Sequence, residues 1–156
     1  LYSDKKTQYL AKLLPTPVDL FIRRFLSSTS WAKNREYKYE LRFTKYSMIV
    51  NAPNLSGCFM FLRVSAIKDV GLFDEDFFMY LEDVDLNRRI HSKYKTIFYP
   101  KVEIIHEYGK GSYNNYKLLM HHIISTIYYF NKWGWFFDKK RAKANLICLN
   151  NLGYKK

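Results

Sequence analysis

Cysteine, glycine and proline are scarce in this sequence, which contains two, six and four of them respectively. Cys58 and Cys148 stand far apart, and neither has a second Cys or a close Cys/His spacing beside it. This spacing excludes a disulfide-dense scaffold and a zinc site of the usual pattern. The few glycines and prolines also exclude collagen-like and low-complexity chains. We expect two reduced thiols in a cytoplasmic protein.

Long hydrophobic runs are also missing. The longest apolar stretches, 47–62 and 118–131, are shorter than the ~18 residues that a spanning helix needs, and they contain Asn, Pro or His. We therefore predict no membrane-spanning segment. The first residues lack the pattern of a signal peptide, and there is no initiator Met. We expect the chain to be part of a longer protein.

The composition is that of a folded domain with an excess of positive charge. A chain of 156 residues can close one core, and 14 Tyr, 12 Phe and 3 Trp are too many for a disordered chain. Subtracting 14 acidic from 26 basic residues leaves a net charge of +12. This charge indicates an anionic partner: nucleic acid, an anionic membrane face or a phosphorylated substrate.

Acidic residues are concentrated in one segment. Seven of the 14 acids lie between 69 and 85, where there is no Lys or Arg. Acidic side chains that cluster despite their mutual repulsion are typical of a site that binds a cation or carries out a reaction. The alternative is a polar loop followed by an acidic helix start. The seven residues are Asp69, Asp74, Glu75, Asp76, Glu82, Asp83 and Asp85.

Local patterns predict several helices and a few short strands. Thr16, Pro17 and Asp19 form a helix-start signal, and apolar residues then recur at helical spacing, which predicts a helix over 17–27. The mixed-charge stretch 33–45 is predicted to be a loop. The other predicted elements are a buried strand at 57–62, helices at 65–70 and 82–94, strands at 96–99 and 102–106, and a long amphipathic helix after a loop at 109–112.

The carboxylates at the start of the predicted helix 82–94 are the sharpest candidates for chemistry. On a helix, Asp83 shares a face with Leu86 and Ile90, which tilts it toward the interior. A carboxylate at the edge of a core, close to other acids, has a raised pKa and can take a proton near neutral pH. Glu82 and Asp85 are explained locally, by the positive end of the helix and, for Asp85, by an arginine four residues on. Since acidic helix starts are common, spacing alone leaves Asp83 either a catalytic base or a helix-start residue.

Longer motifs carry a resemblance to a known family. The string SGCFMFLR at 56–63 is followed by VGLFDEDFFMYLEDVDL at 70–86, and then by Tyr99-Pro100 and Ile105-His106. In order and spacing these motifs resemble the acceptor-side half of a bacterial family 2 glycosyltransferase of the rhamnosyltransferase-like branch. The family often has Ala after the glycine, where this chain has Cys58.

The resemblance implies a fold, a reaction and a division of the chain. The fold is a partial α/β GT-A fold, that of the nucleotide-diphospho-sugar transferases, with a short mixed sheet and flanking helices. Residues 1–112 are expected to form the acceptor-side part of the catalytic domain, and 113–156 a C-terminal amphipathic helical extension. The implied reaction is an inverting transfer of a sugar from a nucleotide-sugar to an acceptor hydroxyl, in the synthesis of bacterial cell-surface polysaccharide.

The family also implies roles for single residues. Asp83 matches the catalytic base that deprotonates the acceptor, and Glu82 is expected to orient the acceptor or hold the helix start. His106 matches a His near the metal and diphosphate, where imidazole can ligate Mg²⁺ or Mn²⁺; its alternative is a hydrogen-bonded structural role. We expect the metal to be held mainly by a nucleotide-binding half that would precede residue 1. The candidate substrate-binding residues are Gly57, Asp85, Lys110 and Ser112, the last two lying in a turn able to contact phosphate.

An aromatic stretch at 128–137 precedes a basic one formed by Lys139, Lys140, Arg141 and Lys143. This pattern fits docking at an anionic membrane face, where a lipid-linked or other glycan acceptor would lie, and so predicts a cytoplasmic protein at the inner face of the plasma membrane. The alternative is an apolar helix packed on the domain, with a solvated basic end. A non-catalytic basic domain that binds membrane or nucleic acid is the competing function. No sequence-specific nucleic-acid motif is present, and we expect no specific nucleic-acid partner, although self-association remains open.

Overall fold

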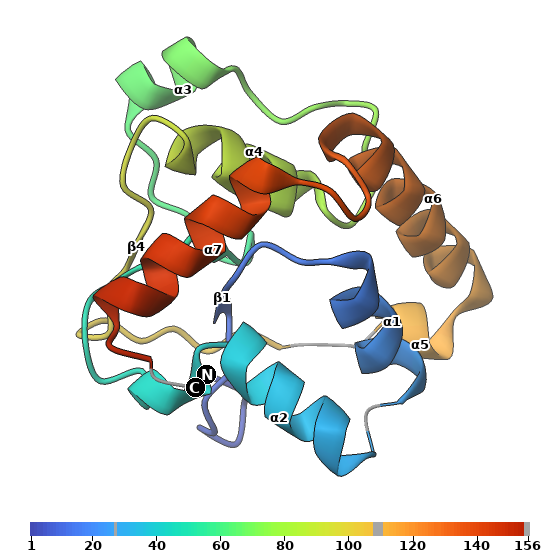
Figure 1. The fold of residues 1–156 in the computed structure, drawn as a ribbon, viewed down its shortest axis with the longest axis horizontal. Coiled ribbons are helices and arrows are strands. Elements are labelled where there is room, and N and C mark those ends of the chain that lie inside the picture. The colour runs from blue at the N-terminus through green and yellow to red at the C-terminus, as the bar shows by residue number, and fades with distance from the viewer. Residues whose placement is uncertain (27, 108–110, 155–156) are drawn as a thin grey trace.

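The computed structural model describes residues 1–26, 28–107 and 111–154. Its elements are mainly helices, together with a few very short strands (Figure 1). In chain order they are β1 (Ala11–Lys12), α1 (Pro17–Phe25), α2 (Ser30–Tyr39), the 3₁₀ helix η1 (Arg42–Thr44), β2 (Val50–Asn51), β3 (Asn54–Leu55), α3 (Val64–Val70), α4 (Glu82–His91), β4 (Ile97–Phe98), α5 (Gly111–Asn114), α6 (Tyr116–Trp133) and α7 (Lys139–Asn151).

The strands form two separate antiparallel pairs. Strand β1 pairs with β3, with Ala11 opposite Leu55 and Lys12 opposite Asn54. Strand β2 pairs with β4 in the same sense. The structure is therefore compatible with a partial α/β fold, but the described residues contain two small antiparallel sheets instead of the predicted mixed sheet.

Two predicted strands are wrong. Residues 57–62 and 102–106 have no strand structure. The apolar run at 57–62 was expected to be buried, but the Phe59 side chain is 63% exposed and that of Phe61 is 97% exposed. A run of apolar letters predicts a buried strand only when a neighbouring strand is there to cover it, and none of the described strands pairs with this one.

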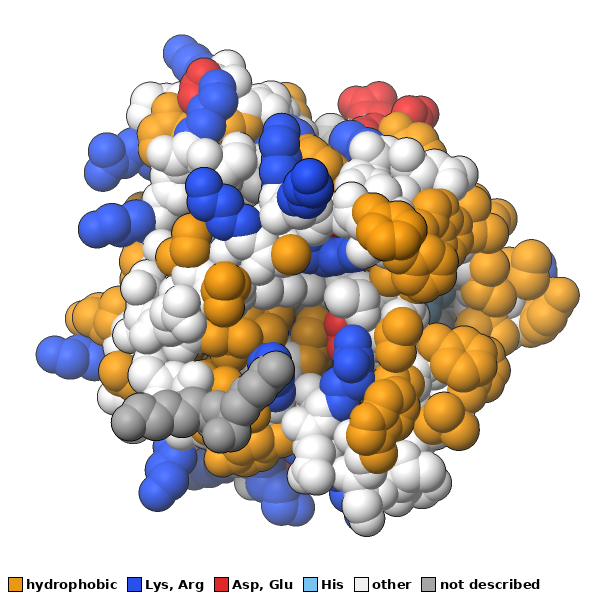
Figure 2. Space-filling view, viewed as in Figure 1, with side chains coloured by type: hydrophobic (Ala, Val, Ile, Leu, Met, Phe, Trp, Pro, Cys, Tyr) orange, Lys and Arg blue, Asp and Glu red, His pale blue; other side chains and the backbone are white. Residues whose placement is uncertain are grey.

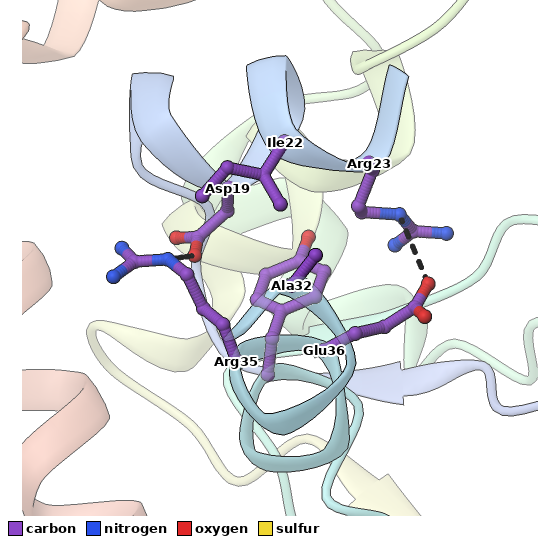
Figure 3. Close-up of a pocket in the computed structure, with 7 residues that line it drawn as sticks. Asp19, Ile22, Arg23, Ala32, Arg35 and Glu36 are labelled. Carbon is purple, nitrogen blue, oxygen red and sulfur yellow. Dashed lines mark hydrogen bonds and ion pairs between the residues drawn. The ribbon is translucent and has the colours of Figure 1, made fainter. Parts of the chain in front are cut away.

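The predicted first helix is confirmed, but the loop predicted after it is wrong. Thr16 caps α1 in a capping box with Asp19, as the sequence pattern indicates. The stretch 33–45 begins inside a second helix, α2, which Thr29 caps. This helix is stabilised by its contacts with α1, because Arg35 donates to Asp19 at 2.6 Å and Glu36 lies 3.8 Å from Arg23 (Figure 3). Tertiary ion pairs thus outweigh a weak local signal.

The predicted helices at 65–70 and 82–94 are confirmed within a few residues as α3 and α4, and the long C-terminal helix is confirmed as α6. Helix α6 ends at Gly134, whose φ of 100° only glycine adopts easily. The sequence reading missed that a second helix, α7, then starts at the Asp138 cap. No helix in the three described ranges has the length and apolar character needed to cross a membrane.

Two clusters of buried side chains hold the elements together. The first contains Cys148 and Leu149 of α7, which pack against residues of β1, β2 and the end of α2. The second joins Tyr129 and Phe130 of α6 to Phe77 and Leu81, just before α4. In the view of Figure 1, α7 crosses the face of the molecule between α4 and α2. The predicted C-terminal extension therefore packs on the rest of the chain through both clusters.

Candidate active site

Helix α4 is entered through a strained turn that fixes the position of its first carboxylates. Tyr80 and Leu81 both have left-handed backbone conformations, with φ of 69° and 62°. Such conformations are costly for residues with a side chain and persist only where surrounding packing holds them. The side chain of Leu81 is buried against Tyr129 and Phe130, which supplies that packing. Core contacts thus set where the helix starts.

Asp83 lies directly against Gly57, from a segment 26 positions earlier in the chain. The Gly57 backbone N–H donates to Asp83 Oδ2 at 2.8 Å, and Val84 N–H donates to Oδ1 at 2.8 Å. A Cβ placed on Gly57 would stand 3.1 Å from the Asp83 Cβ and 3.4 Å from Oδ2. A side chain at position 57 would therefore press on this carboxylate, which would have to shift by a few tenths of an ångström.

The surroundings of Asp83 raise its pKa. Burial is the largest cause, because a desolvated carboxylate resists ionisation. Three groups lower the pKa and so limit the increase: the N–H groups of Gly57 and Val84, and the positive charge of Lys12. A carboxylate with a raised pKa is a better proton acceptor than an ordinary exposed one.

Glu82 is the second carboxylate at the start of α4. Burial raises its pKa, and the charge of Asp83 adds to the rise. Its Oε2 atom is buried and has no hydrogen-bond partner among the residues described. A buried carboxylate oxygen without a hydrogen-bond donor is costly in a folded chain.

Lys12 belongs to this site, although no sequence pattern points to it. It lies on β1 opposite Asn54, and Asn54 precedes Gly57 by three positions. The Lys12 ammonium is 3.6 Å from Glu40. Burial lowers the pKa of Lys12 to about 8, with the charge of Arg23 as the next cause, while Glu40 and Asp83 oppose the shift. Only the pairing of β1 with β3 brings this lysine near Asp83, so no local motif could have revealed it.

A groove opens beside the segment that carries Gly57, although Gly57, Glu82 and Asp83 are not among the residues that line it. It has a volume of about 1080 Å³, and its lining includes Ser56 and Cys58, on either side of Gly57. Asn87 also lines it and fastens α4 to β3, donating to the Leu55 carbonyl at 2.6 Å and to the Asp83 carbonyl at 2.7 Å. The volume is sufficient for a sugar-sized ligand.

Asp85 has a different environment from Asp83. Its side chain is 0% exposed, and Arg89 donates to Oδ2 at 2.8 Å, as the four-residue spacing predicted. Its Oδ1 accepts from Trp133 Nε1 at 2.7 Å and lies 2.9 Å from the Lys132 ammonium. Both oxygens are occupied within the chain, so in this structure Asp85 ties α4 to α6 and has no contact to offer a substrate.

The remaining predicted site residues are placed only in part. His106 Nδ1 lies 3.1 Å from Gln8 Oε1, and Gln8 Nε2 donates to the His106 carbonyl at 2.6 Å. Lys110 falls outside the described residues, and Ser112 lies in α5. Within residues 1–26, 28–107 and 111–154, no three His, Cys, Asp or Glu side chains are grouped so as to hold a metal ion. The metal role of His106 and the phosphate role of residues 110–112 stay predictions.

Comparison with known proteins gives a short match. No family model and no solved structure matches the sequence. The chain is 43% identical over 53 residues to the N-acetylglucosaminyl-diphospho-decaprenol L-rhamnosyltransferase of Mycobacterium tuberculosis, in each of two strains. The likeness is to part of a sugar transferase. The matched segment covers 33% of this chain and spans 17% of the length of these relatives, so it supports a glycosyltransferase at a coarse level.

Proposed function

We propose that this chain supplies the acceptor side of an inverting glycosyltransferase of the family 2 type, with Asp83 as the general base. One observation carries the proposal: Asp83 is a partly buried carboxylate with a raised pKa, held at 2.8 Å by the Gly57 N–H beside a groove. This is the environment that proton abstraction from a hydroxyl requires. The partial likeness to a rhamnosyltransferase supports the same class of reaction.

The proposed step balances as a single displacement. The acceptor hydroxyl gives its proton to Asp83, and the oxygen forms a bond to the anomeric carbon of the donor sugar. The bond between that carbon and the diphosphate oxygen breaks, and the nucleoside diphosphate leaves with the electron pair. Glu82 orients the acceptor or holds the helix start, and the charge of Lys12 limits the rise in the Asp83 pKa.

For the substrates, we propose a nucleotide-linked sugar as donor and a lipid-linked glycan as acceptor, in the synthesis of cell-surface polysaccharide. The names of the relatives, which specify a rhamnosyl transfer to a decaprenol-linked acceptor, support these classes. A divalent metal would stabilise the charge on the leaving diphosphate. The residues that the structure describes do not form a site for this metal.

The test is a transfer assay with the full-length protein that contains this chain. Nucleotide-linked L-rhamnose and a prenyl-diphosphate-linked N-acetylglucosamine are the first substrates, and the anomeric configuration of the product is measured. We expect product with an inverted configuration. A product with retained configuration, or no transfer from any nucleotide-sugar of a panel, would overturn the proposal.

Replacing Gly57 by Ala should separate catalysis from folding. The new methyl group would stand 3.1 Å from the Asp83 Cβ, so the carboxylate must move by a few tenths of an ångström or more. Because small misplacements of reacting groups cost up to about 100-fold in rate, we expect transfer to fall by roughly 10- to 100-fold with the Tm lowered by only a few degrees. Cys58→Ala in the same segment is the control and should retain activity. Equal activities of the two variants would contradict the assigned contact.

Replacing Lys12 by Met should change both stability and the pH profile. The folded-state pKa of Lys12, about 8, lies below its ordinary 10.5, so the unfolded chain binds more protons between these values and the parent gains stability as pH rises through them. At pH 7 the buried charge of Lys12 destabilises the fold, and we expect Lys12→Met to melt a few degrees higher than the parent, with the difference in Tm narrowing toward pH 10.

Loss of the positive charge should also move the acidic limb of the rate profile to higher pH, because Lys12 lowers the pKa of Asp83. The exposed Lys33→Met is the control, and matching profiles for both variants would remove Lys12 from the site.

A further inference from the structure

The connection between α6 and α7 presents two aromatic side chains to solvent. Phe136 is 68% exposed and Phe137 is 99% exposed. Full exposure of a phenylalanine ring forgoes the stabilisation that burial of such a side chain contributes. A pair of adjacent rings in this state indicates a surface that is covered in use.

The loop is ordered by contacts that leave these rings free. Arg141, which the sequence placed in an exposed basic cluster, is instead 4% exposed. It donates to the Trp135 carbonyl at 2.8 Å and to the Gly134 carbonyl at 3.3 Å, while Asp138 accepts from its backbone N–H at 2.9 Å. Asp138 in turn pairs with Arg88 of α4 at 2.6 Å. The loop is thus fastened from its inner side, and the outward direction of the two rings follows from the fold.

Three lysines stand immediately beside the rings. Lys139, Lys140 and Lys143 occupy the first two turns of α7, and all three are exposed. None forms an ion pair with any residue that the structure describes, and the neighbouring Asp138 is buried and paired. Figure 2 shows hydrophobic side chains gathered over the end of α6 and its connection to α7, with Lys and Arg side chains beside them over the start of α7. Apolar rings and unpaired positive charge therefore share one face.

We propose that this face, formed by Phe136, Phe137, Lys139, Lys140 and Lys143, docks on an anionic lipid surface. Aromatic side chains are favoured at the boundary between headgroups and acyl chains, and lysines near the surface are attracted to anionic headgroups. The three unpaired charges complement such a surface, and two rings on a fixed loop can enter it without an ordering cost. A double-stranded nucleic acid would use the charge but leave the rings of Phe136 and Phe137 without an apolar phase, and a single strand that stacks on the rings is separated by the DNA comparison below. This proposal does not depend on the transferase activity.

Vesicle co-sedimentation of the purified protein tests the proposal. The vesicles contain phosphatidylcholine alone or phosphatidylcholine mixed with phosphatidylglycerol, and binding is measured at low and high salt. We expect binding to the mixed vesicles that weakens with salt. Changing Lys139, Lys140 and Lys143 together to Gln should weaken binding on the order of 100-fold, since each lysine near an anionic surface contributes about a factor of five. Phe136→Ser with Phe137→Ser should weaken it by about tenfold or more.

The control variants remove the same number of positive charges, or one fully exposed phenylalanine, elsewhere on the surface. Lys33, Lys68 and Lys101, which are also exposed, are changed together to Gln, and the 97% exposed Phe61 is changed to Ser. These variants should bind within about threefold of the parent. Equal losses in controls and test variants would overturn the proposal, as would absence of binding to the mixed vesicles. Tighter binding to DNA than to vesicles would overturn it in favour of a nucleic acid, and self-association abolished by the Phe136→Ser, Phe137→Ser change would overturn it in favour of a second copy of the chain.

Discussion

Replacing Asp83 by Asn is expected to lower the rate of glycosyl transfer by about 10²- to 10⁴-fold in the full-length protein, the usual effect of losing a general base. The amide has the shape of the carboxylate and can still accept the Gly57 N–H, but it cannot take a proton from the acceptor. The measurement is kcat at saturating donor and acceptor. Glu75→Gln, an exposed acid in the same acidic segment, is the control and should retain full activity.

The same variant should fold as well as the parent. Burial raises the folded-state pKa of Asp83 above its ordinary value, so the stability that its proton binding contributes is present at low pH and is lost as pH rises through the folded pKa. Asn does not ionise, so it does not lose this stability as pH rises. This gain offsets the loss of the hydrogen bond that the Val84 N–H donates to Asp83. We expect a Tm within about 4 °C of the parent at pH 7, improving relative to the parent as pH rises. Transfer within threefold of the parent would remove Asp83 from the mechanism.

Sequence reasoning succeeded where the signal was local. The Thr16 cap, the Gly71 helix end and the acidic start of α4 are determined by residues within a few positions of one another, and all three are present in the structure. The raised pKa of Asp83 was also predictable, because the position of this residue on the helix beside apolar neighbours indicated its burial.

The failures came from contacts between distant segments. Helix α2 has no clear apolar face in the sequence, and it packs on α1 through the buried Ala32 and Tyr39 as well as through its ion pairs. The segment 57–62 reads as a buried strand, but the described residues provide no partner strand for it. Lys12 approaches Asp83 only because β1 pairs with β3, and Arg141 is buried only because its guanidinium binds carbonyls of the preceding loop. These contacts join distant segments and depend on the fold, so a short stretch of sequence does not predict them.

Asp85, two residues after Asp83, is expected to control stability. Its carboxylate is fully buried and joins Arg89 of its own helix to Lys132 and Trp133 of α6. Removing one partner of a buried ionic group leaves the others uncompensated, which typically costs about 3–5 kcal/mol. The Asp85→Ala variant should therefore lose this much free energy of unfolding, although it leaves Asp83 and Gly57 untouched.

Thermal unfolding followed by circular dichroism measures the effect of Asp85→Ala, and we expect the Tm to fall by roughly 10 °C or more. Asp69→Ala is the matched control, since Asp69 also pairs with a lysine, Lys93 at 2.8 Å, but both side chains are exposed. Exposed pairs contribute about 0–1 kcal/mol, so the control should melt within about 3 °C of the parent. Equal melting temperatures for Asp85→Ala and Asp69→Ala would show that α4 and α6 are held together mainly by the apolar cluster of Phe77, Leu81, Tyr129 and Phe130.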